Sequence, residues 1–239
     1  LSSDKLGKIE IVFINPLEHL ISVSYGRFLF RRYLSKFTSP ESFLKSPQFI
    51  WEPCDETNYS RILDSYQDAD LLAIDIETAR EPYIHIKEVG YTAVWFRPDG
   101  KGSPITTHSC VVELDSVSKL SIVRTLNQLP VAKVMQNGKY DNAYLARYDA
   151  VPVNYLWDTA TLMHCWYSEL PKDLAFLGAF FSREAMYWKD LSASGNKRDQ
   201  LLYNCKDTYT TALAFLQMMH EIPAYAKANY LNEFPLLFP

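Results

Sequence analysis

The stretch LLAIDIET, residues 71–78, decides the fold of this chain. Residues 71–76 form a nearly continuous apolar run, as expected for a strand that is buried on both faces of a sheet. The two-residue period of a strand places Asp75 and Glu77 on one face. Charges on a largely apolar strand are costly unless something neutralises them, and carboxylate oxygens suit Mg²⁺ or Mn²⁺. The sequence therefore predicts either a metal site here or a strand end at which both acids meet solvent.

Neighbouring segments extend this strand into a sheet. The turn residues between 98 and 102 join two strands tightly, so residues 71–76, 89–96 and 105–114 are expected to form an antiparallel meander. The strand at 132–136 follows a helix and is expected to lie parallel to 71–76. A further short strand is predicted at 48–52. Helices are predicted at 58–67, 116–129, 140–148, from Asp158, 173–181, 198–220 and after Pro223. The result is an α/β fold, with a mixed five-stranded sheet and helices on both faces.

Residues 1–47 differ from the rest of the chain. They hold seven Lys and Arg against four Asp and Glu, a net of +3, whereas the whole chain carries −4. Lys8–Asn15 alternates like a strand, and the basic segment Leu17–Phe37 follows it. The basic residues either touch a phosphate backbone or form a solvated helix face, and the second interpretation is favoured. Ser and Pro residues at 39–47 indicate a boundary. We therefore predict a small N-terminal extension of unknown role, residues 1–47, and a main domain, residues 48–239.

Composition narrows the function. With 239 residues, 48% hydrophobic and 22% charged, the chain is an ordinary globular protein. Its negative net charge excludes a protein that holds duplex nucleic acid by charge alone, so a nucleic-acid role must rest on a local site. The charge also argues against a membrane partner, and no apolar stretch approaches the roughly 18 residues of a membrane span.

Localisation is read from the cysteines and the N-terminus. The chain has 4 cysteines, none in a Cys-x-x-Cys pair, which predicts reduced thiols in an intracellular protein. The compartment would be the cytoplasm, nucleoid or organelle matrix. No signal peptide is visible. The start at Leu1 without Met is expected of a processed or shortened chain.

Two further acidic motifs follow Asp75 and Glu77. In the run QNGKYD, residues 136–141, a strand ends, a glycine turns the chain, and a helix begins with Asp141 in its first turn. An acid at that position also suits the helix dipole, which is the alternative explanation. In the long helix, Tyr203 and Asp207 lie on one face because they are four residues apart. A single exposed acid on an amphipathic helix is the alternative there. Each alternative explains one motif, but all three motifs in this order are much harder to obtain by chance than any one of them.

These motifs resemble the three exonuclease motifs of the DEDD superfamily. They correspond to Asp75/Glu77, to Asn137-x-x-x-Asp141 and to Tyr203-x-x-x-Asp207. Tyrosine four residues before the last acid is typical of the DEDDy branch; the DEDDh branch has histidine five residues before it, where this chain has Leu202. The resemblance implies a ribonuclease H-like fold and 3′→5′ exonuclease activity.

The middle motif resembles a narrower group, the proofreading domain of family A DNA polymerases of the polymerase I kind. That group carries a Gln-Asn-x-Lys-Tyr-Asp run, here residues 136–141, and an Asp-Thr pair, here Asp158-Thr159. The stretch EFPL, residues 233–236, is similar to the passage from exonuclease to polymerase domain. The resemblance covers residues 48–239. The match to the family's motifs is inexact, which favours a phage or organellar relative. It implies a single-stranded DNA 3′ end as substrate and a DNA polymerase domain, in cis or in trans, as partner. Whether such a domain follows Pro239 is left open.

The resemblance also implies a cofactor and a role for each acid. Two divalent cations, Mg²⁺ or Mn²⁺, would lie between the acids and the scissile phosphate. Asp75 would bridge both ions, Glu77 and Asp207 would hold one of them, and Asp141 would hold the other, mostly through water. Tyr203 would orient the attacking water, since a pKa of about 10 makes tyrosine a poor general base at neutral pH.

Substrate contacts are implied in the same way. Positions that touch the terminal nucleotides in the family correspond to Thr78, Gln136, Asn137 and Tyr140. The segment Tyr187–Lys189, together with Lys197 and Arg198, would flank the strand. Trp188 would either stack on a base or pack in the core.

Two other functions remain open. An exoribonuclease resembling ribonuclease D shares Tyr-x-x-x-Asp, but its middle motif does not usually read Gln-Asn-x-Lys-Tyr-Asp. A catalytically inactive domain that only binds nucleic acid would have the fold without the acids, and the presence of all four acids argues against it.

Overall fold

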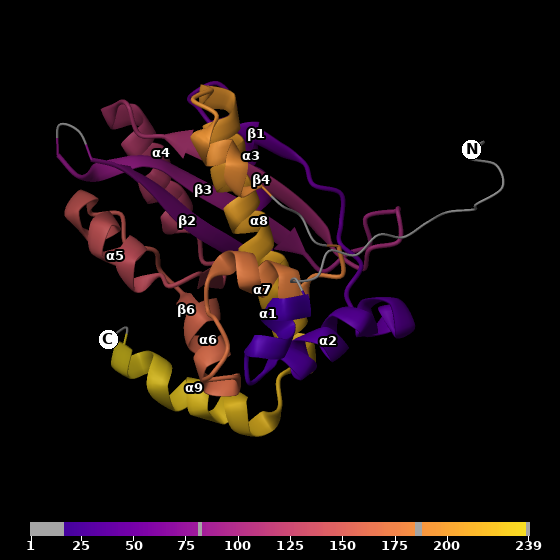
Figure 1. Cartoon of the computed structure of the whole chain (residues 1–239). Helices are drawn as coiled ribbons and strands as arrows, with labels where there is room; N and C mark the ends of the chain where they lie inside the picture. The colour runs from indigo at the N-terminus through magenta and orange to yellow at the C-terminus, as the bar shows by residue number, and fades with distance from the viewer. Residues whose placement is uncertain (1–16, 81–82, 185–187, 238–239) are drawn as a thin grey trace.

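The computed structural model describes residues 17–80, 83–184 and 188–237 (Figure 1). Within these residues, six strands form one mixed sheet in the order β1-β4-β3-β2-β5-β6. The strands are β1 (Trp51–Pro53), β2 (Leu71–Ala79), β3 (His85–Trp95), β4 (Thr106–Glu113), β5 (Lys133–Met135) and β6 (Tyr155–Asp158). The α-helices are α1 (Leu17–Ser22), α2 (Gly26–Thr38), α3 (Tyr59–Tyr66), α4 (Val117–Asn127), α5 (Lys139–Leu145), α6 (Thr159–Trp166), α7 (Leu174–Phe181), α8 (Lys197–Glu221) and α9 (Ala224–Leu237).

The predicted sheet is confirmed, with one strand more than expected. β2, β3 and β4 pair antiparallel, and β5 lies parallel to β2. The correction is β6, which pairs parallel with β5 in a segment before Asp158 where the sequence analysis predicted no strand. β6 has four residues and lies at the edge of the sheet, where most of its side chains are partly exposed. It therefore carries neither a buried apolar run nor a clear alternation.

Helices cover both faces of the sheet, and β2 sends alternate side chains to each. Leu72, Ile74 and Ile76 pack with α3, α4 and α5. Leu71 and Ala73 pack into the other core, with α6, α7, α8 and α9. Asp75 and Glu77 continue this second row, so they lie on the face that the long helix α8 crosses (Figure 1). The pattern of one strand thus brings its two acids under α8.

The N-terminal helices pack against the main body. Leu29 and Tyr33 of α2 are buried in the same core as Phe180 and Phe181 of α7. Two of the basic residues expected on a solvated face make inward contacts: Arg32 Nε donates to the carbonyl of Phe180 at 3.0 Å, and Lys36 Nζ donates to the carbonyl of Ala179. Arg27 and Arg31 are exposed. The predicted strand at 8–15 lies outside the described residues.

Two further findings concern the whole fold. Among the residues that the structure describes, no helix combines the length and apolar character needed to cross a membrane. All four cysteines are free, and Cys54, Cys110 and Cys205 are buried. Buried thiols of this kind act as small apolar side chains in the core.

Candidate active site

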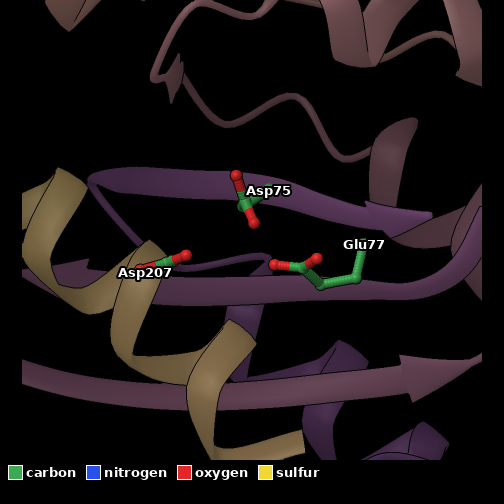
Figure 2. A group of neighbouring side chains, drawn as sticks. All are labelled: Asp75, Glu77 and Asp207. Carbon is green, nitrogen blue, oxygen red and sulfur yellow. The ribbon is translucent and has the colours of Figure 1, made fainter. Parts of the chain in front are cut away.

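Three carboxylates from two elements meet at one point of the structure. Asp75 and Glu77 come from β2, and Asp207 comes from α8 (Figure 2). Each offers one oxygen, and these oxygens all lie within 4.8 Å of one another. Figure 2 shows the Glu77 side chain reaching toward the other two acids. Carboxylate oxygens at this spacing are a suitable ligand set for a hard divalent cation.

Asp141 lies beside this cluster without belonging to it. It stands in the first turn of α5, is 5% exposed, and accepts a hydrogen bond from the backbone N–H of Ile76 at 3.1 Å. β5 ends at Met135, and the left-handed backbone of Asn137 (φ 55°) turns the chain so that α5 starts next to β2. Asparagine tolerates this conformation better than most residues. The turn thus brings the acid of the middle motif against the strand that carries the first.

The electrostatics of the site follow from burial and crowding. Burial, and then the neighbouring Asp141, Asp207 and Glu77, raise the pKa of Asp75 well above its usual range. Burial, followed by Asp207 and Glu88, raises the pKa of Glu77 to about 7. Burial raises the pKa of Asp141 to about 7 as well. Several buried acids with raised pKa values at one place are typical of a site that binds a cation.

The ammonium group of Lys189 is in contact with Asp207. Lys189 Nζ lies 3.0 Å from Asp207 Oδ1 and 3.3 Å from Oδ2, and it donates to the hydroxyl of Tyr203 at 2.9 Å. Burial lowers the pKa of Lys189, but Asp207 and Tyr203 together raise it above its ordinary value. Trp188 Nε1 donates to the same carboxylate, at Oδ1. The sequence analysis placed Lys189 only in a segment flanking the strand; nothing in the spacing showed that it reaches into the acids.

The residues expected to touch the substrate lie in different settings. Tyr140 is 47% exposed, and its hydroxyl is 3.1 Å from Thr78 Oγ1. Asn137 is exposed in the turn. Gln136 is half-buried, and both ends of its side-chain amide are hydrogen-bonded within the protein. The nitrogen donates to the Lys172 carbonyl, and the oxygen accepts from Thr159 Oγ1.

Trp188 is 4% exposed, so its ring packs in the interior, which corresponds to the second of its two predicted roles. Its neighbour Tyr187 lies outside the described residues.

A polar cleft adjoins the carboxylate cluster. It has a volume of about 130 Å³. Lys87 Nζ pairs there with Glu88 Oε1 at 2.9 Å and donates to Gln200. The cleft is lined by Glu77, Thr78, Lys87, Glu88, Ser192, Gln200 and Tyr203. The cleft thus has Glu77 of the cluster and Tyr203 of α8 in one lining.

Comparison with known proteins finds the same fold without a close relative in sequence. No protein-family model matches the chain, and no curated protein matches it. The catalytic core of RRP6 from Trypanosoma brucei matches with a TM-score of 0.58 and 14% identity, over 88% of this chain and 60% of that one. The Trypanosoma brucei RNase D complex with RNA U12 matches with a TM-score of 0.55 and 15% identity, over 83% of this chain and 74% of that one. Escherichia coli RNase D, an exoribonuclease involved in structured RNA processing, matches with a TM-score of 0.54 and 17% identity, over 81% of this chain and 50% of that one.

These likenesses concern the fold. The chain has the ribonuclease H-like mixed α/β architecture of these exonuclease structures. It spans 60% of the RRP6 catalytic core, so it is similar to only part of that protein.

Proposed function

We propose that this chain is a 3′→5′ exonuclease that hydrolyses phosphodiester bonds with the help of two divalent cations. The observation that carries the proposal is the meeting of Asp75, Glu77 and Asp207, with Asp141 beside them. A phosphodiester is anionic and so is this cluster, so the two repel unless cations lie between them. A requirement for cations also explains how a chain of net charge −4 can act on nucleic acid.

The donor set fits such ions. The oxygens are carboxylates and they converge. Burial, and after it the neighbouring carboxylates, raise the pKa of Asp75 and of Glu77, so a cation would favour their ionised forms. Asp75, Glu77 and Asp207 hold the ions, and Asp141 assists through water. When bound, the ions lower the pKa of the attacking water and offset the charge of the phosphate.

Tyr203 orients the attacking water. Burial raises the pKa of its hydroxyl above the ordinary value, so the group is neutral at pH 7 and is not a base. The Lys189 ammonium can only donate, so the Tyr203 oxygen accepts from it. The Tyr203 hydroxyl is also a hydrogen-bond partner of Asp207.

The substrate is a 3′ end of RNA or of single-stranded DNA, and different observations support each. The solved neighbours support RNA, because they include an exoribonuclease and a complex with RNA. The run 136–141 and the Asp158-Thr159 pair support DNA and proofreading for a polymerase domain in cis or in trans. The four free cysteines support an intracellular setting for either.

The experiment is a digestion of matched RNA and DNA oligomers labelled at the 5′ end. Wild-type protein with Mg²⁺ is expected to shorten the labelled strand stepwise from the 3′ end, and EDTA to stop the reaction. Faster digestion of RNA supports the exoribonuclease, and faster digestion of DNA supports proofreading.

Variants of the acids test the site itself. Asp75→Asn and Glu77→Gln are expected to lower the rate by about two orders of magnitude or more. Asp149→Asn is the control, because that side chain is 93% exposed and its ion-pair partner is Arg124, which is not one of the site residues. Full activity of Asp75→Asn would show that the site is elsewhere.

A further inference from the structure

Asn204 of α8 contacts Asp75 of the carboxylate cluster through a hydrogen bond. It follows Tyr203 in the helix and is completely buried, at 0% exposure. Its side-chain Nδ2 donates to Asp75 Oδ2 at 3.2 Å. A metal-binding Asp75 is ionised and can only accept, so the amide nitrogen is the atom that faces it. One oxygen of Asp75 is therefore engaged by the protein, and the other is left for a ligand.

Gly90 provides the space that Asn204 fills. In the sheet it is the residue of β3 paired with Asp75. A Cβ atom built on Gly90 would lie 1.6 Å from Asn204 Oδ1 and 2.7 Å from its Cγ. Gly90 is not among the glycines with a positive φ, so its backbone conformation does not require glycine. The close approach of the Asn204 amide accounts for glycine at this position.

Stability alone does not account for an asparagine here. Asn204 Oδ1 is buried and has no hydrogen-bond partner among the residues that the structure describes, so this polar atom is desolvated without compensation. An apolar side chain of the same shape would avoid that loss. The feature that asparagine adds is the donor to Asp75.

We propose that Asn204 is a positioning residue for Asp75, holding its carboxylate in the orientation that binds a divalent cation. This inference rests on the proposed function. The other buried acids of the site also accept hydrogen bonds from the protein: Asp141 from the Ile76 N–H and Asp207 from Trp188. Donors behind metal ligands orient those ligands, and their loss commonly weakens metal binding about 10- to 100-fold.

The test is a calorimetric titration of the full chain with Mn²⁺. Asn204→Leu keeps the shape of the side chain and removes both the donor and the unpaired oxygen. The loss of the unpaired oxygen offsets the loss of the donor, so the variant is expected to stay folded, and it should bind Mn²⁺ about 10- to 100-fold more weakly. The control is Asn127→Leu: Asn127 is also fully buried, but it donates to the Ala150 carbonyl and accepts from Tyr91, away from the acids. This control is expected to lower the unfolding temperature and to leave the affinity for Mn²⁺ unchanged.

A second pair of variants uses the glycine. Gly90→Ala is expected to displace the amide, so it should weaken Mn²⁺ binding by a similar factor and lower the unfolding temperature. In the double variant Gly90→Ala/Asn204→Ala, the clash with the amide is gone and the new methyl group meets the backbone oxygen of residue 204 at 3.2 Å. The loss of affinity is therefore expected to be close to that of Asn204→Ala alone.

The outcomes separate the two proposals. If wild-type protein binds Mn²⁺ and Asn204→Leu binds it equally well, the positioning role is overturned and the proposed function stands. If wild-type protein binds no Mn²⁺, both are overturned. Recovery of nuclease activity of Asn204→Leu at high Mn²⁺, with no recovery for Asp75→Asn, supports a role behind the ligand.

Discussion

At the scale of single residues, Lys189 shows how the site manages its charge. Its ammonium lies between Asp207 and Tyr203, and Asp207 is only 5% exposed. Lys189→Met would leave that carboxylate buried without its ammonium partner, although Trp188 and Tyr203 still hydrogen-bond to it. We expect the metal-free protein to lose about 1–3 kcal/mol of unfolding free energy, measured by urea denaturation in EDTA. The loss should shrink in saturating Mn²⁺, because a bound cation then neutralises Asp207.

A surface pair gives the control for this variant. Lys197 pairs with Glu113 at 2.7 Å, but its side chain is 66% exposed. Lys197→Met is expected to cost less than about 1 kcal/mol, with or without Mn²⁺. Equal losses for the two variants, or a Lys189→Met loss that Mn²⁺ leaves unchanged, would contradict the assigned contact.

The raised pKa of Glu77 makes a prediction about pH. Burial raises this pKa from 4.5 to about 7, so between these values the folded protein keeps a proton that the unfolded chain has released. Stability contributed by that proton is present at low pH and is lost as pH rises through the folded pKa. Glu77→Gln does not titrate. In EDTA it should therefore gain about 1–3 kcal/mol of unfolding free energy relative to wild type on going from pH 5 to pH 8.

Urea denaturation at the two pH values checks this prediction. Mg²⁺ is the internal control, because the ion favours ionised Glu77 and should abolish the advantage of the variant at pH 8. An advantage of equal size at pH 5 and pH 8 in EDTA would show that Glu77 is not buried against other acids.

At the scale of the elements, Asp158 ties three segments together. Its Oδ2 accepts from the Gly138 N–H and from the Tyr155 hydroxyl, both at 2.8 Å, and its Oδ1 accepts from the Thr161 N–H at 2.8 Å. Asp158→Ala removes the N-cap of α6 and leaves the turn before α5 without its acceptor. We expect a loss of about 3–5 kcal/mol by urea denaturation. Nuclease activity should also fall, because α5 carries Asp141.

An exposed helix cap gives the comparison. Asp173 caps α7 by accepting from the Phe176 N–H at 2.9 Å, and it is exposed. Asp173→Ala should cost about 0.5–2 kcal/mol and leave activity unchanged. If Asp158→Ala behaved like Asp173→Ala, the three contacts would not act together.

The sequence predicted the elements with strong periodicity and missed those whose cause is tertiary. β2 and α8 follow from a buried run and a long apolar repeat, so the face of Asp75 and the face of Asp207 were both predictable. β6 was not, because an edge strand of four residues leaves no pattern. Asn204 and Lys189 were not assigned roles either, because their contacts depend on how α8 and the segment before it lie against the sheet.

At the scale of the whole molecule, α2 belongs to the core by its contacts. Leu29 is 1% exposed and packs with residues of α7, whereas Leu34 of the same helix is 42% exposed. Leu29→Ala is expected to cost about 2–5 kcal/mol, and Leu34→Ala less than about 0.5 kcal/mol. Thermal unfolding of both variants measures the difference. Equal, small losses would show that α2 contributes nothing to the stability of the main body.

This packing could not be predicted from the sequence, because a basic segment bounded by Ser and Pro resembles an appendage. The sequence pattern does not indicate that Arg32 and Lys36 donate to carbonyls at the end of α7. Long cationic side chains bury their stems while their ends find acceptors, so charge alone did not identify the exposed face.

The central claim is that Asp75, Glu77 and Asp207 bind divalent cations. The most direct measurement is anomalous diffraction from crystals of the protein soaked in Mn²⁺. We predict two Mn²⁺ peaks, about 3.5–4 Å apart, with Asp75 in contact with both. The absence of any peak among these three carboxylates, in crystals that hold Mn²⁺ elsewhere, would contradict the account.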